Sequence, residues 1–194
     1  MVDTVLSLLI GLGLAAACGF RVFVPLLIMS LASRAEVGHL ALSGHFAWIG
    51  STPALIAFSV ATLLEIAGYY IPWVDNLLDT VATPTAIVAG VLVTASSMTS
   101  DVSPFLKWTL AVVAGGGTTA VFQGITAMAR HVSSFTTGGL GNPVLATAEA
   151  GSSALLAVLA ITLPVLAFLL VLGLLYFGVK KLLFRRPRPA ARAA

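Results

Sequence analysis

Residues 153–178 read SALLAVLAITLPVLAFLLVLGLLYFG, an apolar stretch without a single charged side chain. A helix needs about 20 apolar residues to span the hydrocarbon core of a bilayer, so this stretch is long enough to cross it. Lys180 and Lys181 follow almost directly. The C-terminal part of the chain is therefore predicted to be a transmembrane helix followed by a basic tail.

The rest of the chain has the same apolar bias. Of its 194 residues, 59% are hydrophobic and only 9% are charged, whereas about 25% of the residues in an average soluble domain are charged. Its single cysteine, Cys18, rules out an intrachain disulfide. This composition excludes a soluble enzyme, a nucleic-acid-binding protein and a disulfide-built secreted module.

Proline, glycine and charged residues divide the chain into five hydrophobic segments. The segments are residues 4–31, 53–71, 84–100, 105–129 and 153–178, with a short amphipathic piece at 73–82. Several begin where Ser, Thr or Asn precedes proline, a pair that favours a helix start. We predict an all-α integral membrane protein with about four to five transmembrane helices, of which one or two are broken or re-entrant.

The domain organisation follows from the position of the basic residues. Residues 1–179 are predicted to form a single polytopic domain, and residues 180–194 a basic tail. The tail holds six of the ten Lys and Arg residues: Lys180, Lys181, Arg185, Arg186, Arg188 and Arg192. Positive charge beyond a span favours the cytoplasmic side, so we expect a bacterial inner-membrane protein with a cytoplasmic C terminus. Counting back through single crossings then predicts that Arg130 lies outside. The tail is either a topology anchor or a regulated lipid-binding segment.

Two regions are predicted to break at membrane depth. Gly19, Arg21 and Pro25 interrupt the first segment, and a glycine-rich run precedes Asn142 and Pro143. The first segment is either one broken span or a re-entrant hairpin. Irregular backbone is tolerated in a bilayer only inside protein or beside a watery cavity, so either alternative places Arg21 in the protein interior.

Charged residues inside apolar segments are costly and mark candidate functional sites. Arg21 and Glu65 meet this criterion most clearly, and Glu149 and Asn142 flank the second break. Three consecutive helices are also predicted to carry polar faces. The residues singled out on these faces are Thr62, Ser97, Asp101, Thr119, Gln123 and Thr126. The faces either form hydrogen bonds between helices or line a solute pathway.

An acidic and aromatic cluster follows the second segment. Tyr69, Tyr70 and Trp73 are typical of the membrane interface. Asp75 and Asp79 are four residues apart, which places both carboxylates on one helical face. They either bind a hard cation or complement the start of a helix and bridge to an arginine, so a metal site stays undecided.

No nucleophile elbow, phosphate-binding loop or HExxH pattern occurs in the sequence. His39, His45 and His131 lack the spacing of metal ligands. We therefore expect neither enzymatic activity nor a cofactor.

Three motifs together resemble one family. They are GFRVFVPL at residues 19–26, the region from LEI at 64–66 to YIPWVDNLLD at 70–79, and TGGLGNP at 137–143. The chain resembles, over almost its whole length up to the tail, the bacterial membrane family known as domain of unknown function 4126. The resemblance implies a polytopic membrane protein and assigns no catalytic residue.

The sequence favours a channel or secondary transporter for a small ion or polar solute, in which Arg21, Glu65, Asp75 and Asp79 matter most. Because four or five crossings form a thin wall around a pathway, we expect a homo-oligomer in the lipid bilayer. The alternative is a non-transporting scaffold, or a lipid-handling or partner-binding protein. Glu65→Gln separates the two at this stage, since a transporter would lose flux and a scaffold would lose stability.

Overall fold

The computed structural model describes residues 2–42 and 44–183, without the side chains of residues 72, 73, 75–77, 79, 179 and 181–183. Every regular element in this part is helical, as predicted. The elements are α1 (Val2–Cys18), α2 (Phe23–Ala35), the 3₁₀ helix η1 (Gly44–Gly50), α3 (Thr52–Gly68), α4 (Pro72–Ser97), α5 (Pro104–Leu110), the π-helix η2 (Ala111–Gly116), α6 (Gly117–Thr137), α7 (Asn142–Thr162) and α8 (Pro164–Leu183).

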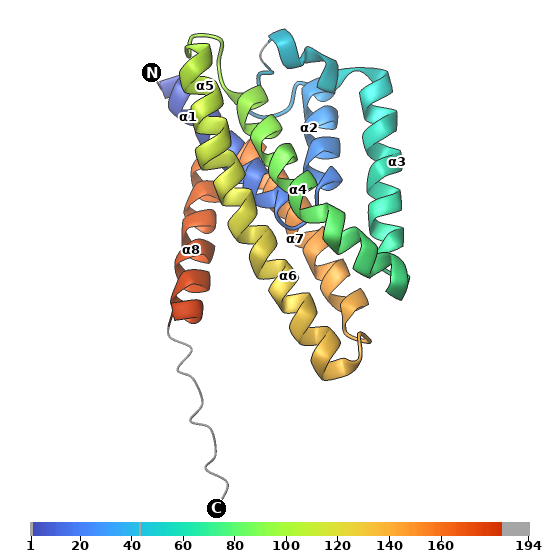
Figure 1. Ribbon diagram of the computed structural model, residues 1–194. Helices are drawn as coiled ribbons and strands as arrows, with labels where there is room; N and C mark the ends of the chain where they lie inside the picture. The colour runs from blue at the N-terminus through green and yellow to red at the C-terminus, as the bar shows by residue number, and fades with distance from the viewer. Residues whose placement is uncertain (1, 43, 184–194) are drawn as a thin grey trace, which may run out of the picture.

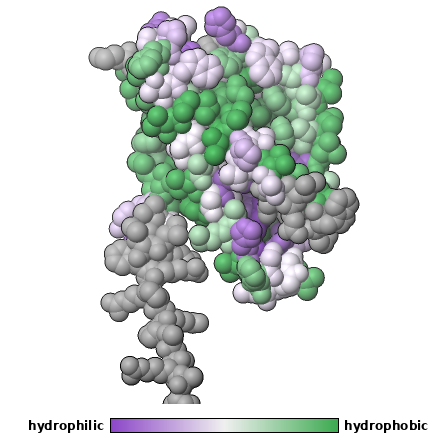
Figure 2. Space-filling view, in the orientation of Figure 1, coloured by the Kyte–Doolittle hydropathy of each residue, from purple (hydrophilic) through white to green (hydrophobic). Residues whose placement is uncertain are grey.

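The lengths and composition of these helices are those of a multi-pass membrane protein. Three helices in the described part are long and apolar enough to cross a membrane: Thr80–Ser97, Pro104–Thr137 and Asn142–Thr162. A fourth span arises if η1 and α3, which are bent by 60°, count as one. Figure 2 shows apolar side chains over much of the visible face, with hydrophilic ones along the upper edge and again in the lower half.

Helices α1 and α2 form a hairpin, the shape expected from the re-entrant alternative for the first segment (Figure 1). Thr94 Oγ1 of α4 donates to the Gly11 carbonyl of α1 at 3.2 Å. Ser96 Oγ, two residues further along α4, donates to Met29 Sδ of α2 at 3.9 Å. Both arms of the hairpin therefore reach the same level of α4, and the break between them lies deeper in the molecule.

The single span predicted over residues 153–178 is wrong. Helix α7 ends at Thr162, Leu163 adopts φ −133° and ψ 65°, and α8 begins at Pro164. A residue before proline is disfavoured in the helical region, which explains a break at this position. The apolar stretch is thus shared by two helices that form a second hairpin.

This second hairpin also corrects the predicted topology. Helix α8 runs back beside α6, where a Cβ on Gly178 would lie 3.0 Å from Ile125 Cδ1. The end of α8 and the turn between α6 and α7 therefore lie at the same end of the molecule (Figure 1). The count that placed Arg130 opposite the tail is wrong because it treated α7 and α8 as one crossing.

Helix α4 differs from the prediction as well. The amphipathic piece 73–82 and the segment 84–100 form one helix that contains Pro84. Proline is tolerated inside membrane helices where neighbouring groups compensate for the missing hydrogen bond. The Thr83–Pro84 pair is therefore not a helix start here.

Helix α1 is the centre of the core, because Leu14 to Cys18 are all fully buried. Hydroxyl groups of three other helices donate to its carbonyls. The bonds run from Thr94 to Gly11 at 3.2 Å, Thr119 to Ala15 at 2.7 Å, Ser153 to Ala17 at 2.9 Å and Thr126 to Gly19, beyond the last turn of α1, at 3.3 Å. Such bonds stabilise packed membrane helices by about 0.6 kcal/mol each.

The two hairpins predict a specific pattern of labelling from the two sides of a membrane. Cysteines introduced one at a time at Asp3 and Glu36 should react with an impermeant maleimide from one side, and those at Ser134 and Lys180 from the other. Cys18 is fully buried and can stay in the background. Labelling of Ser134 and Lys180 variants from opposite sides would contradict the α7–α8 hairpin.

Candidate functional site

The hairpin break at residues 19–22 places Arg21 inside the protein. A Cβ on Gly19 would collide with Phe122 Cβ and lie 3.0 Å from the Thr119 carbonyl oxygen, so the chain approaches α6 too closely for any side chain there. Arg21 is only 2% exposed. The predicted interior location of Arg21 is confirmed.

Arg21 and Arg130 share one carboxylate, that of Glu149. Arg130 Nε donates to Glu149 Oε1 at 3.1 Å, and Arg130 Nη2 pairs with Oε2. Arg21 Nη2 lies 3.3 Å from the same Oε2 and donates to the Ala146 carbonyl at 2.9 Å. A single carboxylate of α7 therefore joins the hairpin break to α6.

Tyr69 completes this arrangement at the end of α3. The centroid of its ring lies 3.9 Å from Arg21 Cζ and 4.0 Å from Arg130 Cζ, so both guanidinium groups contact the ring. Cations over an aromatic face are attracted by the negative potential of the ring, most strongly where water is excluded. Tyr69 is 4% exposed, so it is a buried residue in contact with the two arginines. The sequence predicted that it would lie at the membrane interface instead.

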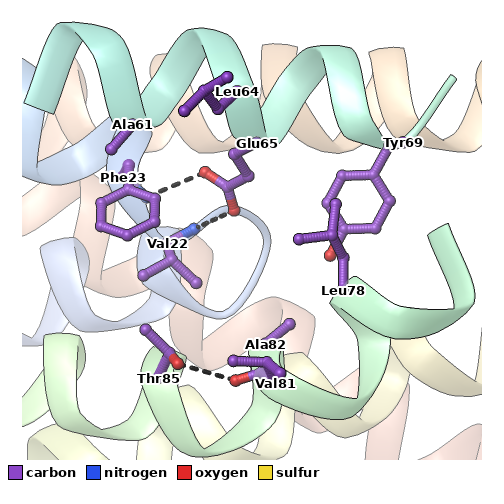
Figure 3. A pocket seen from close by; sticks show the side chains of 10 residues that line it. All are labelled: Val22, Phe23, Ala61, Leu64, Glu65, Tyr69, Leu78, Val81, Ala82 and Thr85. Atoms are coloured by element: carbon purple, nitrogen blue, oxygen red, sulfur yellow. Dashed lines mark hydrogen bonds between the residues drawn. The ribbon is translucent and has the colours of Figure 1, made fainter. Parts of the chain in front are cut away.

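The Glu65 carboxylate contacts two backbone amides at the start of α2. Its Oε1 accepts from the Val22 amide at 2.8 Å and its Oε2 from the Phe23 amide at 3.0 Å (Figure 3). Helix α2 has no side-chain cap of its own. Because the first amides of a helix lack partners and form the positive end of its dipole, Glu65 caps α2 from a neighbouring helix.

We call Arg21, Glu65, Tyr69, Arg130 and Glu149 the buried charge cluster. Two positive and two negative side chains balance each other, and none is more than 8% exposed. Its members come from the hairpin break, α3, α6 and α7, which are far apart in sequence. The cluster can hold or exchange charge inside a membrane domain.

The other predicted site residues do not join the cluster. Asn142, at the start of α7, donates to Ser134 Oγ at 3.1 Å and so closes the turn after α6. The backbones of Asp75 and Asp79 lie at the start of α4, and their side chains lie outside the described residues. Among the described residues, no three His, Cys, Asp or Glu side chains are grouped to hold a metal ion.

The predicted polar faces serve mainly as contacts between or within helices. Thr119 and Thr126 bond to backbone carbonyls of the α1 region, and Ser97 donates to the Val93 carbonyl of its own helix at 2.7 Å. Thr62 and Gln123 are buried. Asp101 lies exposed in the turn after α4, so its placement on a helical face is wrong.

Sequence reasoning left two cluster members out of the predicted site. Arg130 extends the polar face of α6, four residues after Thr126, and this spacing was the available signal. Tyr69 follows Glu65 by four residues and extends the polar face of α3 with the same spacing. Its aromatic ring near the end of a span favoured an interface position instead.

An apolar groove lies in front of Glu65, between α3 and α4 (Figure 3). Its volume is about 380 Å³. It is lined by Val22, Phe23, Ala61, Leu64, Glu65, Tyr69, Leu78, Val81, Ala82 and Thr85. The groove therefore connects the outer surface of two helices to two members of the buried charge cluster.

Comparison with known proteins identifies one family. No curated protein and no solved structure gives a significant match to the chain. The family described as Domain of unknown function (DUF4126) matches residues 8–183, which include all the described helices except the first six residues of α1. By this match, the chain belongs to the DUF4126 family.

Proposed function

We propose that this protein is a channel or secondary transporter for a small ion or polar solute, with the buried charge cluster as its gate. The cluster itself carries the proposal. A charged side chain in a membrane helix costs about 2.5–3.5 kcal/mol on insertion scales, and buried ion pairs are often replaceable by apolar residues without loss of stability. Two buried arginines that share the carboxylate of Glu149 are therefore better accounted for by function than by packing.

The position of the cluster suits a gate. Discontinuous helices in transporters present their ends to ions and solutes near the middle of the membrane, and here a hairpin break presents Arg21 to Glu149. Because Glu149 serves both arginines, a solute or proton that engages one partner weakens the contact to the other. Arg130 and Tyr69 would then move with α6 and the end of α3.

The assembly is part of the proposal. Three grooves along the described residues are lined mainly by apolar groups. Under this proposal the polar path would run through a rearranged cluster or between copies of the chain. We propose a homo-oligomer in the bacterial inner membrane, with the basic tail in the cytoplasm. The proposal includes no enzymatic step and no cofactor.

A second candidate is a non-transporting scaffold or lipid-handling protein. The observation that favours it is the use of Thr94, Thr119, Thr126 and Ser153 as hydrogen-bond donors to α1-region carbonyls. These polar side chains stabilise packing and line no path. Under this candidate function, the buried charge cluster is a static contact that holds the helices together.

Flux in proteoliposomes separates the two. Protons, Na⁺, K⁺, Mg²⁺, chloride and phosphate are screened with the wild type and with Arg21→Lys, which keeps the charge but loses the guanidinium fork. We expect flux of one species to fall at least about tenfold, about 1.4 kcal/mol, while the melting temperature stays close to that of the wild type. Arg34→Lys, on an exposed arginine of α2, is the matched control and should keep full flux.

Absence of flux for every species would contradict transport and favour the scaffold. Equal flux in Arg21→Lys and the wild type would show that the cluster is not the gate. Glu65→Gln is no longer a useful test, because Glu65 caps α2 and its loss should reduce stability under either candidate.

A further inference from the structure

The groove between α3 and α4 supports an inference that holds whether or not the chain transports a solute. We propose that it binds a membrane amphiphile with a single apolar chain and a neutral hydroxyl head, whose hydroxyl donates to Glu65. The apolar chain would lie between the two helices, and the head would lie at the inner end of the groove.

The groove has the size and access that such a ligand needs. Its volume of about 380 Å³ is within the range of about 300–1,000 Å³ for small-molecule sites. Leu64 and Val81 on its lining are 67% and 54% exposed, on surfaces that face lipid in a membrane. A ligand can therefore enter sideways from the bilayer without crossing water.

Glu65 defines the head group. Among the described residues that line the groove, it is the one with a charged side chain (Figure 3). A carboxylate accepts about four hydrogen bonds, and each Glu65 oxygen has one, from the Val22 or the Phe23 amide. The Thr85 hydroxyl already donates to the Val81 carbonyl at 2.8 Å. The remaining acceptor positions of Glu65 therefore call for a donor from the ligand.

Charge balance then selects a neutral donor. Arg21, Arg130, Glu65 and Glu149 sum to zero, so an ammonium head would leave one buried positive charge in excess. A carboxylate head would bring a second acceptor against Glu65 and add a negative charge. A hydroxyl satisfies Glu65 and leaves the balance unchanged, since buried charges without a partner are strongly unfavourable.

Photolabelling tests the proposal on the full chain in nanodiscs. Three probes with the same diazirine-bearing chain are compared: a long-chain alcohol, the fatty acid and the fatty amine. We expect the alcohol to label groove residues of α3 and α4 at least about tenfold more strongly than the other two probes. A tenfold difference in affinity corresponds to about 1.4 kcal/mol, and one hydrogen bond to a charged group is enough to supply it. Excess unlabelled long-chain alcohol should remove this labelling.

Two variants locate the site. Ala82→Phe and Ala61→Phe each fill the groove from one helix without touching the arginines, and each should reduce labelling about tenfold. Ala67→Phe places the same side chain on an exposed part of α3 outside the groove and should leave labelling unchanged. Elution profile and melting temperature establish that each variant is folded.

The other outcomes overturn the proposal. Equal labelling by the three probes, or stronger labelling by the acid or the amine, contradicts the hydroxyl head. Labelling that unlabelled alcohol fails to displace, or that both groove-filling variants leave unchanged, contradicts the groove. Competition is measured on the wild type, so a poorly folded variant does not remove the test.

Discussion

Glu149→Gln is expected to lose about 3–5 kcal/mol of stability, the cost of removing one partner from a buried ion pair. The substitution keeps the size of the side chain but leaves Arg130 and Arg21 without their shared carboxylate. Native proteins have only about 5–15 kcal/mol of net stability. A large fall in melting temperature and in the yield of monodisperse protein would be the measured result.

Glu36→Gln is the matched control for this prediction. Glu36 follows α2, is exposed and lies outside the buried charge cluster. The free energy of unfolding of this variant should therefore stay within about 0.5 kcal/mol of the wild-type value. A Glu149→Gln variant as stable as this control would show that the two arginines have other means of compensation, and the role of Glu149 as the shared partner would be wrong.

Gly90→Val is expected to separate helices that pack at the centre of the protein. A Cβ at Gly90 would collide with Thr119 Oγ1, and would lie 2.8 Å from Thr119 Cβ and 3.3 Å from the Gly115 carbonyl oxygen. Thr119 donates to the Ala15 carbonyl of α1, so displacing it also breaks a contact of the core. Overpacking costs about 1–3 kcal/mol, and the lost hydrogen bond increases this cost.

Thermal unfolding in detergent measures this effect. Gly124→Val is the matched control, because a Cβ on Gly124 of α6 meets no atom within 4 Å. It should leave the melting temperature unchanged or raise it slightly, since glycine is unfavourable inside a helix. Equal melting temperatures for the two variants would contradict close packing of α4 against α6.

The fold class and part of the cluster could be predicted from the sequence because both depend on composition. Apolar segments identify a membrane protein, and the cost of charge in lipid identifies Arg21, Glu65 and Glu149 as unusual. Pairing could not be predicted in the same way. It depends on which helices meet, and nothing local to Glu65 shows that it caps the helix after Arg21 instead of pairing with Arg21.

The positions of helix breaks were the weaker part of the prediction. Pro84 and Pro164 look alike in sequence, yet the first lies inside α4 and the second begins α8. Whether a proline ends a membrane helix depends on the surrounding groups that satisfy the backbone, which are tertiary contacts. An error at Pro164 alone was enough to reverse the predicted side of Arg130.

The hydrogen bonds to α1 also constrain how the protein is made. The ribosome synthesises α1 before its hydrogen-bond partners, which follow much later in the chain: Thr94, Thr119, Thr126 and Ser153. Domains generally fold from the N terminus as they are synthesised, but α1 can reach its final contacts only after α4, α6 and α7 have entered the bilayer. The contacts at the centre of the protein therefore form late, once Ser153 of α7 has been synthesised.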